Sequence, residues 1–443
     1  MQITPARIIV GYYIIVVTIA TILLSLPISR VKDAEWSFID AVFTSVSAVS
    51  VTGLSTIEVS KTFTPFGTLI FMLILQIGGV GIMTIGTFFW LLFRKKISFK
   101  ERRLIMADQN QVSFSGLVQL LKQLLIVLTA IELFGALILG TYYLHFYPTW
   151  QEAYYNGLFS SISATTNGGF NLTGSSLIPY KNDYFVQFIH MILIILGAIG
   201  FPVLIELKNY FFREKDSYER VTFSLFTKIT TLTYFLLAAI GAFLFYIFEF
   251  GGFLKGKTWH ESLFYGLFHS ISTRSGGFVT MDLSLLSEST QLLFSGLMFI
   301  GASPSSVGGG IRTTTFALTI LFLIQFARGN RTIKIFKREI FDEDYLKALV
   351  VSIFGVILCF TAILIISYTD DFPINAIVFE VCSAFGTSGM SLGITPELSV
   401  IGKIIIMILM FIGRVGILMF IFMIGGKEKK ENYHYPKERI IIG

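Results

Sequence analysis

The sequence predicts an all-α integral membrane protein with eight transmembrane helices, built as four tandem repeats. Three observations support this prediction: the composition, the spacing of apolar stretches, and an internal repetition. Hydrophobic residues make up 54% of the 443 residues and charged residues only 14%, whereas an ordinary soluble domain carries about 25% charged residues. The mean hydropathy is +0.74, so much of the apolar surface must face lipid.

Eight apolar stretches are long enough to cross about 30 Å of hydrocarbon. They lie near residues 8–28, 66–93, 124–144, 184–205, 229–248, 289–326, 348–369 and 402–424. The second stretch is unusual, because Thr62 to Phe93 is a run of 32 residues without a charge. At about 1.5 Å per residue such a helix exceeds one straight crossing, so we expect it to tilt or to begin outside the membrane.

The distribution of Lys and Arg predicts the orientation of the spans. With a cytoplasmic N-terminus, inside segments carry 24 of the 34 basic residues and outside segments carry 8, while Arg312 and Arg414 fall at membrane depth. The outside segments hold 14 acidic residues, which gives the outer face a net charge of −6 and would concentrate cations there. We therefore expect a multi-pass protein with both termini in the cytoplasm. The positive net charge follows from this asymmetry and does not indicate nucleic-acid binding.

A recurring motif divides the chain into four units. Each outside segment holds a short helix with a Phe-x-Ser-like pattern, and a glycine followed by a bulky apolar residue comes nine or ten residues after the Phe. The motifs begin at Phe43, Phe159, Phe268 and Phe379. The predicted units are residues 1–93, 94–207 with a basic cytoplasmic loop at its start, 208–340 and 341–426, followed by a basic cytoplasmic tail at 427–443.

The short helices are predicted to be re-entrant. At roughly 12 residues each, they cannot cross the bilayer, and they can dip in and return only if the non-helical backbone lines water or is buried in protein. The segments that follow are rich in small residues, and glycine permits backbone angles that aim successive carbonyls at one axis. Four such segments around an axis would replace the hydration shell of a monovalent cation, and the C-terminal ends of the helices would favour a cation there.

The predicted filter follows from this arrangement. For one segment alone, a turn in an outer loop is the simpler explanation of the glycine, but the fourfold recurrence favours a pore. The predicted filter residues are Val51, Thr52, Gly53, Asn167, Gly168, Gly169, Ser275, Gly276, Gly277, Thr387, Ser388 and Gly389. The predicted ligands of the ion are the backbone carbonyls of Val51, Thr52, Asn167, Gly168, Ser275, Gly276, Thr387 and Ser388. His269 and Arg274 are expected to shape the hydrogen bonding of the third segment.

With these motifs, essentially the whole chain resembles the TrkH/KtrB/HKT superfamily of cation transporters. It resembles KtrB most closely, because the first span begins at Ile8, where the TrkH type has additional N-terminal helices. The resemblance implies four M1–P–M2 units in a pseudo-fourfold arrangement around one pore, a homodimer of such chains, and a cytosolic nucleotide-binding ring of the KtrA type. All four filter positions are glycine here, whereas some plant relatives that transport Na⁺ have serine in the first. The resemblance therefore implies K⁺ uptake across a bacterial plasma (inner) membrane, driven by the membrane potential.

The sixth apolar stretch contains Gly301-Ala-Ser-Pro-Ser-Ser-Val-Gly-Gly-Gly310. Proline removes a helical hydrogen bond, glycines favour irregular backbone, and serines can satisfy the freed backbone groups. We expect a loop at mid-membrane below the filter, with a simple kink as the alternative. The resemblance implies that this loop gates the pore and is moved by the partner protein. The predicted gate residues are Gly301, Ser303, Pro304, Ser305, Ser306, Gly308, Gly309, Gly310 and Arg414.

Two charges in the spans call for an explanation. Arg414 stands where the other units have Gly79, Ala198 and Ala302, and a guanidinium at membrane depth is costly and usually functional. It could act as a positive barrier below the filter, which the resemblance favours, or it could pair with the carbonyl end of a helix. Glu132 is expected to form a structural pair or to lie near the interface, and no functional role is assigned to it.

Other functions remain open at this point. One glycine per segment constrains an ion loosely, so the chain could conduct Na⁺ or discriminate poorly among monovalent cations, and Na⁺ could also act as an activator. An intramembrane enzyme would need His, Asp or Glu side chains clustered at one membrane face, but the five histidines are scattered. The chain has no G-x-x-x-x-G-K-[ST] motif, so we expect no ATPase activity, no nucleotide bound by this chain and no covalent cofactor.

Overall fold

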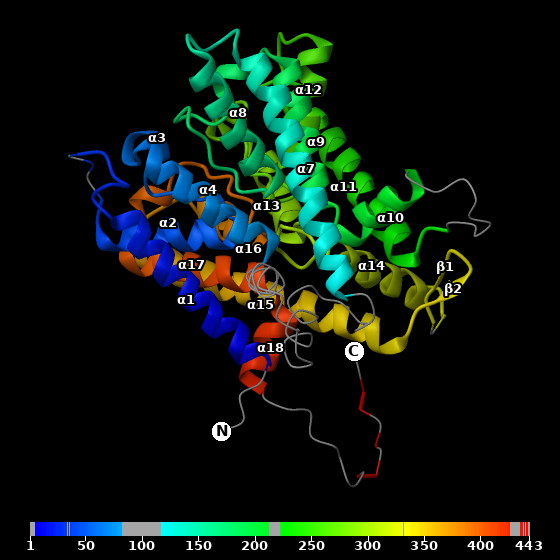
Figure 1. Cartoon of the computed structure of the whole chain (residues 1–443). Helices are drawn as coiled ribbons and strands as arrows, with labels where there is room; N and C mark the ends of the chain where they lie inside the picture. The colour runs from blue at the N-terminus through cyan, green and yellow to red at the C-terminus, as the bar shows by residue number, and fades with distance from the viewer. Residues whose placement is uncertain are drawn as a thin grey trace.

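The computed structural model describes residues 5–32, 34, 36–81, 117–211, 222–330, 332–425, 435, 436, 438, 440 and 441. The described chain is mostly helical, as predicted (Figure 1). The second predicted span beyond Gly81, the basic segment 94–116 and most of the tail 427–443 lie outside the described residues.

The first helix of each unit is long and apolar. These helices are α1 (Pro5–Ser25), α7 (Leu117–Tyr143), α11 (Leu225–Glu249) and α15 (Asp342–Thr369). Each contains a window long and apolar enough to cross a membrane. Large apolar side chains on their outer faces are exposed, among them Ile14, Phe134, Phe243 and Phe360. A helix that is apolar on its exposed face as well as its buried face suits lipid rather than water.

A short helix follows in each unit: α2 (Phe38–Ser50), α8 (Trp150–Thr165), α12 (Trp259–Ser272) and α16 (Ile374–Gly386). Their N-termini are well defined by the sequence. Ser37 with Asp40, and Thr258 with Glu261, form capping boxes in which each residue satisfies a free backbone N–H of the other. The longest of the four has 16 residues and would reach only about 24 Å. None is long enough to cross the hydrocarbon layer alone, as the re-entrant prediction requires.

The third helix of each unit ends at a glycine with positive φ. In the first unit, α4 (Pro65–Val80) ends at Gly81. In the second and fourth units, a second helix follows the glycine at a steep angle, and in the third unit a longer loop separates the two helices. The helix pairs are α9 (Tyr184–Ala198) with α10 (Phe201–Phe211) at 106°, α13 (Glu288–Ile300) with α14 (Thr313–Ala327), and α17 (Val400–Val415) with α18 (Ile417–Gly425) at 101°.

These breaks correct the sequence analysis, which expected single spans at 184–205 and 402–424 and a break in the third unit alone. The glycines that follow these helices have φ of 98° at Gly81, 103° at Gly200, 70° at Gly301 and 95° at Gly416. Such angles are disallowed in a right-handed helix and are open to glycine. The third unit differs in the length of its break: a loop of residues 301–312 separates α13 from α14, whereas one or two residues suffice in the second and fourth units.

The remaining elements are short. They are α3 (Val59–Thr62), the 3₁₀ turns η1 (Ile178–Tyr180), η2 (Leu283–Leu285) and η3 (Thr395–Glu397), and the strands β1 (Lys334–Ile335) and β2 (Arg338–Glu339). The two strands pair antiparallel, with Lys334 opposite Glu339, and the sequence analysis did not predict this hairpin.

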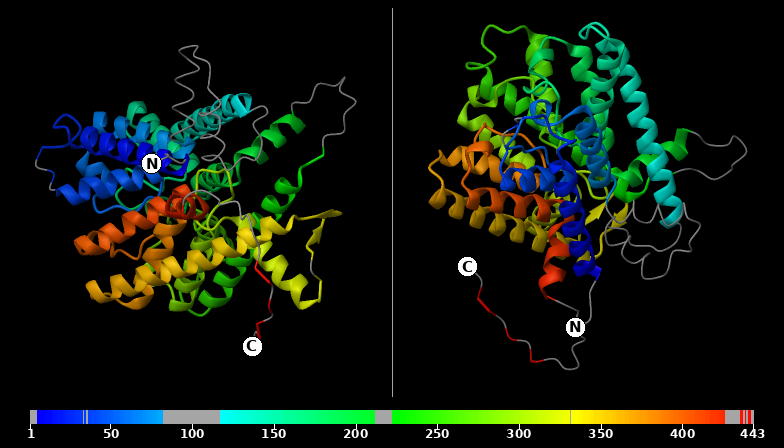
Figure 2. Two further views of the ribbon diagram at one scale, coloured as in Figure 1. Left: turned by 90° about the horizontal axis from the view of Figure 1, so that it is seen from below. Right: turned by 60° about the vertical axis from the view of Figure 1, so that its left-hand side comes forward.

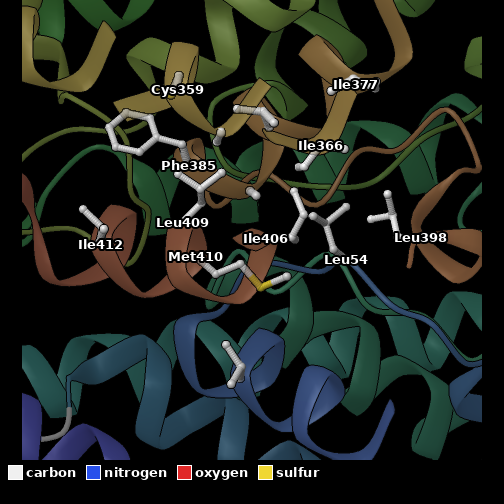
Figure 3. Packing of buried hydrophobic residues seen from close by; sticks show 14 of the residues in the cluster. Leu54, Cys359, Ile366, Ile377, Phe385, Leu398, Ile406, Leu409, Met410 and Ile412 are labelled. Atoms are coloured by element: carbon white, nitrogen blue, oxygen red, sulfur yellow. The ribbon is translucent and has the colours of Figure 1, made fainter. Parts of the chain in front are cut away.

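The four units pack as a closed ring. The third helix of each unit lies against the short helix of the next: α4 on α8, α9 on α12, α13 on α16, and α17 on α2. The last contact joins the fourth unit to the first, and these two lie side by side in Figure 2. The largest buried apolar cluster also crosses this seam: Leu54 lies among Leu398, Ile406 and Met410 (Figure 3). The C-terminal ends of the four short helices therefore face a common centre.

An ion pair closes the ring at its outer rim. The Nζ atom of Lys403 on α17 lies 3.0 Å from Oδ1 of Asp40 on α2. Burial alone would raise the pKa of Asp40, but hydrogen bonds from Ser37 and Lys403 outweigh it and hold the pKa below its usual value. A carboxyl with a lowered pKa stabilises the folded state above its unfolded pKa, and this contribution is lost as the pH falls through the folded pKa.

We predict that Lys403→Met lowers stability at pH 7 by about 1–3 kcal/mol, because both side chains are mostly buried and the change leaves the Asp40 carboxylate without its charged partner. The loss should vanish at a pH low enough to protonate Asp40 in both proteins. Thermal unfolding of purified protein at neutral and acid pH measures both values. Lys347→Met, which removes an exposed pair with Glu343 within α15, is the control. An equal loss of stability from Lys403→Met at both pH values would contradict the role of the pair.

Candidate functional site

The four segments that follow the short helices share one backbone conformation. We call residues 51–54, 167–170, 275–278 and 387–390 the glycine segments. The first residue of each has a positive φ: 54° at Val51, 55° at Asn167, 88° at Ser275 and 46° at Thr387. Two residues later, the glycine again has a positive φ. Such an angle at a β-branched residue is a rare outlier that costs about 1–3 kcal/mol and is usually retained at functional sites.

The glycines of the four segments surround one axis. A Cβ on Gly53 would lie 2.6 Å from the carbonyl oxygen of Gly168, and one on Gly277 would lie 2.5 Å from that of Ser388. A Cβ on Gly169 would lie 3.3 Å from the carbonyl oxygen of Gly276, and one on Gly389 would meet the carbonyl oxygen of Thr52. Each glycine thus contacts the carbonyl of the neighbouring unit in cyclic order. Any larger side chain at these positions would displace a carbonyl that borders the axis.

A serine from each short helix holds its glycine segment in place. The backbone N–H of Gly53 donates to Ser47 Oγ at 3.2 Å, and that of Gly389 donates to Ser383 Oγ at 3.1 Å. In the other two units, the hydroxyls of Ser163 and Ser272 donate to the carbonyl oxygens of Phe170 and Phe278, at 2.7 and 2.6 Å. The sequence analysis assigned these serines no role, although they are the last residue of the Phe-x-Ser-like motif. The recurrence of serine at this motif position in all four units is the signal that could have identified them.

The third unit departs from the pattern because its helix-to-glycine distance is one residue shorter. The N–H of Gly276 bonds to Ser272 O at 2.7 Å, four residues back, where the equivalent bonds of the other units reach five residues back. His269 Nδ1 lies 2.9 Å from Tyr265 O, and its Nε2 accepts from the N–H of Thr280 at 3.3 Å. The buried guanidinium of Arg274 donates to Leu297 O, at 3.2 Å, at the end of α13. His269 therefore holds the backbone just after the third segment, at Thr280, while Arg274 bonds to α13.

The break in the third unit is a loop and not a kink. Residues 301–311 are buried except for the half-buried Pro304. The loop bonds to the second unit where α9 and α10 meet. The Ser303 N–H donates to Ala198 O at 3.0 Å, and the Phe201 N–H donates to Ser305 O at 2.7 Å. It closes on itself through Ala302 N to Gly309 O at 3.1 Å.

The loop lies directly against two of the glycine segments. A Cβ on Gly308 would lie 2.6 Å from Cβ and Oγ of Ser275, and one on Gly309 would lie 2.7 Å from Oγ1 of Thr387. Only glycine fits at these two positions without movement of the neighbours. The loop therefore lies beside the predicted filter residues of the third and fourth units.

Two arginines hold the loop. At the end of α4, Arg414 donates to the carbonyl oxygens of Gly78 and Gly79, and the bond to Gly79 O is 2.9 Å long. Arg414 also donates to Val307 O in the loop. Arg312 donates to Gly308 O and to Ser303 O, the latter at 3.3 Å. Of the two alternatives for Arg414, this geometry supports pairing with the carbonyl end of a helix, where the helix dipole favours a cation. The contribution of Arg312 was missed: the sequence shows its depth but not its partners.

The small residues of the third helices let them approach the short helices closely. A Cβ on Gly78 would lie 2.5 Å from Val49 O. Gly197 and Gly413 meet the carbonyl oxygens of Thr165 and Phe385 in the same way. These three glycines therefore allow the helices to pack directly on the backbone of the short helices.

Glu132 is a hydrogen-bonded side chain between two units. Its carboxylate accepts from Gln76 Nε2 of α4, and its backbone oxygen accepts from Ser161 Oγ at 2.7 Å. The side chain is buried, so the pairing expectation is confirmed.

Backbone oxygens are the ligands that this centre offers to an ion. Within the part of the chain that the structure describes, no three His, Cys, Asp or Glu side chains converge as a metal site. Cys359 and Cys382 are buried and free. The C-terminal ends of α2, α8, α12 and α16 add partial negative charge at the centre. Such a centre suits a monovalent cation held by carbonyls.

Comparison with known proteins gives consistent matches over the chain. A family model described as "TrkH: Cation transport protein" matches residues 4–430. The chain is 56% identical over 440 residues to the Ktr system potassium uptake protein D of Bacillus subtilis, covering 99% of this chain and 97% of that protein. It is 36% identical over 448 residues to the Ktr system potassium uptake protein B of the same organism, covering 100% of this chain and 98% of that protein.

A solved structure shares the fold. The crystal structure of the potassium transporter TrkH from Vibrio parahaemolyticus matches with a TM-score of 0.72 at 16% sequence identity, covering 94% of this chain and 84% of that one. Of the two Ktr proteins, protein D is the more similar to this chain, whereas the sequence analysis expected the closest resemblance to protein B.

Proposed function

The chain belongs to the TrkH family of cation transport proteins, and on that premise we propose that it takes up K⁺ across the plasma membrane of a bacterium. The relatives matched over nearly the whole chain are named potassium uptake proteins. We propose that the ring of glycine segments is the K⁺ filter and that residues 301–312 form its gate. The chain is a transport protein and not an enzyme.

The observation that supports this proposal most strongly is the cyclic contact of the four glycines. Each glycine of the ring contacts the carbonyl oxygen of the residue before the next glycine, at Gly168, Gly276, Ser388 and Thr52. A ring of backbone carbonyls can replace the hydration shell of K⁺ without an ionised side chain. The four short helices direct their negative ends at the same point. In the proposed filter, the carbonyls at the two positions before each glycine are the ligands.

The proposed architecture extends what the described helices show. We propose eight crossings in four M1–P–M2 units, with the unit boundaries given above and with both termini in the cytoplasm. The four long helices and the two bent pairs support six of these crossings. The short helices enter from the outer face, where the acidic residues gather. Two such chains would form a homodimer on a cytosolic nucleotide-binding ring of the KtrA type, as the family resemblance implies, and Na⁺ would act as an activator if one is needed.

Flux through such a pore needs no energy source within the chain. A membrane potential contributes about 2.3 kcal/mol per charge per 100 mV, which drives K⁺ inward when the cytoplasm is negative. Nucleotides would then act only through the cytosolic partner, by moving the loop.

We propose that the contacts of the loop hold the gate closed. The loop fills the space beside Ser275 and Thr387. Arg414 bonds both to the end of α4 and to the loop, whereas Arg312 bonds to carbonyl oxygens within the loop. In this account Arg414 is a clamp for the closed loop, so its removal favours the open state.

We predict that Arg414→Gln raises K⁺ flux in the absence of the partner by about fivefold or more, because coupling energies of 1–3 kcal/mol correspond to about 5- to 150-fold. Flux of K⁺ into cells or vesicles measures this. Arg328→Gln, at the exposed end of α14, is the matched control and should leave flux unchanged. A flux at or below the wild-type value with normal protein yield would contradict the clamp.

Uptake into cells that lack their own K⁺ transporters tests the proposal as a whole. The cells express this chain with and without a KtrA-type partner, at low external K⁺, with and without Na⁺. We expect growth and K⁺ accumulation that the partner increases. If well-expressed, membrane-inserted protein supports Na⁺ but not K⁺ accumulation, the K⁺ assignment fails and Na⁺ conduction replaces it. If neither ion accumulates, the transport assignment for this ring fails.

A further inference from the structure

A hydroxyl joins the third and fourth glycine segments. Ser275 Oγ donates to the carbonyl oxygen of Thr387 at 2.6 Å, and it lies 3.2 Å from Thr387 Oγ1. Both residues are fully buried. The Thr387 carbonyl is one of the proposed K⁺ ligands, so one of its two lone pairs is already engaged by a side chain of the neighbouring unit.

The equivalent residues of the other two segments are arranged differently. Val51 has no hydroxyl. The side chain of Asn167 turns back towards the carbonyl oxygens of Ala164 and Ile194, and with its amide nitrogen assigned to that side it donates to them at 2.8 and 3.3 Å. Among the described residues, the cross-unit bond at this level of the ring is therefore confined to the third and fourth units.

The intramembrane loop lies against this same pair. Gly308 packs on the Ser275 side chain and Gly309 on the Thr387 side chain, with room for hydrogen but not for a methyl group. On its other side, the Gly308 carbonyl accepts a hydrogen bond from Arg312. The loop is thus held between an arginine and the hydroxyl-bearing pair, and it limits the directions in which Ser275 can turn.

We propose that Ser275 is the positioning residue through which the loop acts on the filter. This inference rests on the proposed function of the ring and the loop. With the loop seated, the Ser275 hydroxyl is held on the Thr387 carbonyl, and that carbonyl is a weaker ligand for the ion. When the loop withdraws, the Ser275 side chain is free to turn away and the carbonyl regains its full ligand strength. The seated loop would therefore restrict flux and also set the ion selectivity of the flux that remains.

The backbone at Ser275 offers two ways to remove the hydroxyl. Its φ of 88° lies in a region that favours glycine. Ser275→Gly therefore removes the hydroxyl and relieves the backbone, whereas Ser275→Ala removes the hydroxyl and keeps the strain. If Ser275 had a purely structural role, the two variants would differ in their K⁺-to-Na⁺ flux ratio. If the hydrogen bond matters, its loss would change the ratio of both variants alike.

The experiment measures the K⁺-to-Na⁺ flux ratio of purified protein in liposomes. We compare wild type, Ser275→Ala and Ser275→Gly, each with the complete loop and with Ser305–Gly309 deleted. Arg414→Gln provides a milder way to release the loop if the deletion variant does not fold. Ser295→Ala is the control: among the described residues, it removes a buried hydroxyl that bonds to Gln291 O of the same helix at 2.8 Å.

We expect both Ser275 variants to change the flux ratio by at least about fivefold when the loop is complete, and by less than about twofold when it is deleted or released. Ser295→Ala should leave the ratio unchanged in every background. Equal changes with and without the loop, a change in one Ser275 variant only, or no change in either would overturn the inference while leaving the filter proposal standing. A wild-type protein without K⁺ flux would overturn both.

Discussion

Replacing Gly277 with alanine should lower K⁺ uptake by about 10- to 100-fold in a protein that still folds and inserts. The new Cβ would lie 2.5 Å from Ser388 O and 2.9 Å from the Cα of Gly169, so the ring must widen or a carbonyl must turn away. Loss of one interaction with a charged group costs about 1.5–3 kcal/mol, and each 1.36 kcal/mol is a factor of ten in rate.

Gly393→Ala is the matched control for this prediction. Gly393 also has a positive φ, of 97°, but a Cβ there would meet no atom within 4 Å. The two variants share the backbone strain, and only Gly277→Ala intrudes on the ring. Uptake of K⁺ by both, normalised to the amount of protein in the membrane, separates the two effects. Equal uptake by both variants would contradict the ring as the ion path.

Deletion of Ser305–Gly309 should raise K⁺ flux by about 5- to 150-fold without the partner and should weaken the response to the partner. The deletion removes both glycines that seat the loop against Ser275 and Thr387, together with the Val307 carbonyl that Arg414 binds. With these contacts gone, little holds the path closed.

Flux into vesicles with and without a KtrA-type ring measures both effects. Deletion of Lys334–Arg338, five residues in the hairpin beyond the same broken helix pair, is the control for a shortened third unit. If the deletion of Ser305–Gly309 leaves flux unchanged and still regulated, the loop is a structural feature and the gate lies elsewhere.

The repeats explain how much of this site the sequence predicts. The recurring Phe-x-Ser-like helix and the glycine after it identify the four segments, and the structure brings all four glycines to one axis. The prediction succeeds because each unit repeats the same local problem: a helix too short to span must end at a backbone that only glycine and a few strained residues can adopt. A similar argument locates the loop at 301–312, where proline and glycines accumulate.

The bends in the second and fourth units were not predicted, for a physical reason. A single glycine, such as Gly200 or Gly416, is tolerated within a helix at a cost of about 1 kcal/mol, and its sequence surroundings do not show whether it bends. The bend depends on packing against other units. At Gly200, the Phe201 N–H bonds to Ser305 in the third unit, more than 100 residues away.

The partners of the buried arginines could also not be predicted from the sequence. Arg312 and Arg414 stand out as charges at membrane depth, but their ligands are backbone carbonyls, which every residue carries. Gly78 and Val307 become partners of Arg414 only when the first, third and fourth units meet. The bond between Ser275 and Thr387 likewise joins residues 112 positions apart.

The most direct test of the central claim is ion flux through the purified chain in liposomes, without its partner, for K⁺ and Na⁺ separately. An outward K⁺ gradient with a proton carrier drives proton uptake only if K⁺ leaves through the protein, and a pH-sensitive dye reports it. We predict K⁺ flux above that of protein-free liposomes, smaller flux with Na⁺, and loss of the K⁺ signal in Gly277→Ala but not in Gly393→Ala. K⁺ flux that persists unchanged in Gly277→Ala would contradict the proposal that the four glycines surround the ion path.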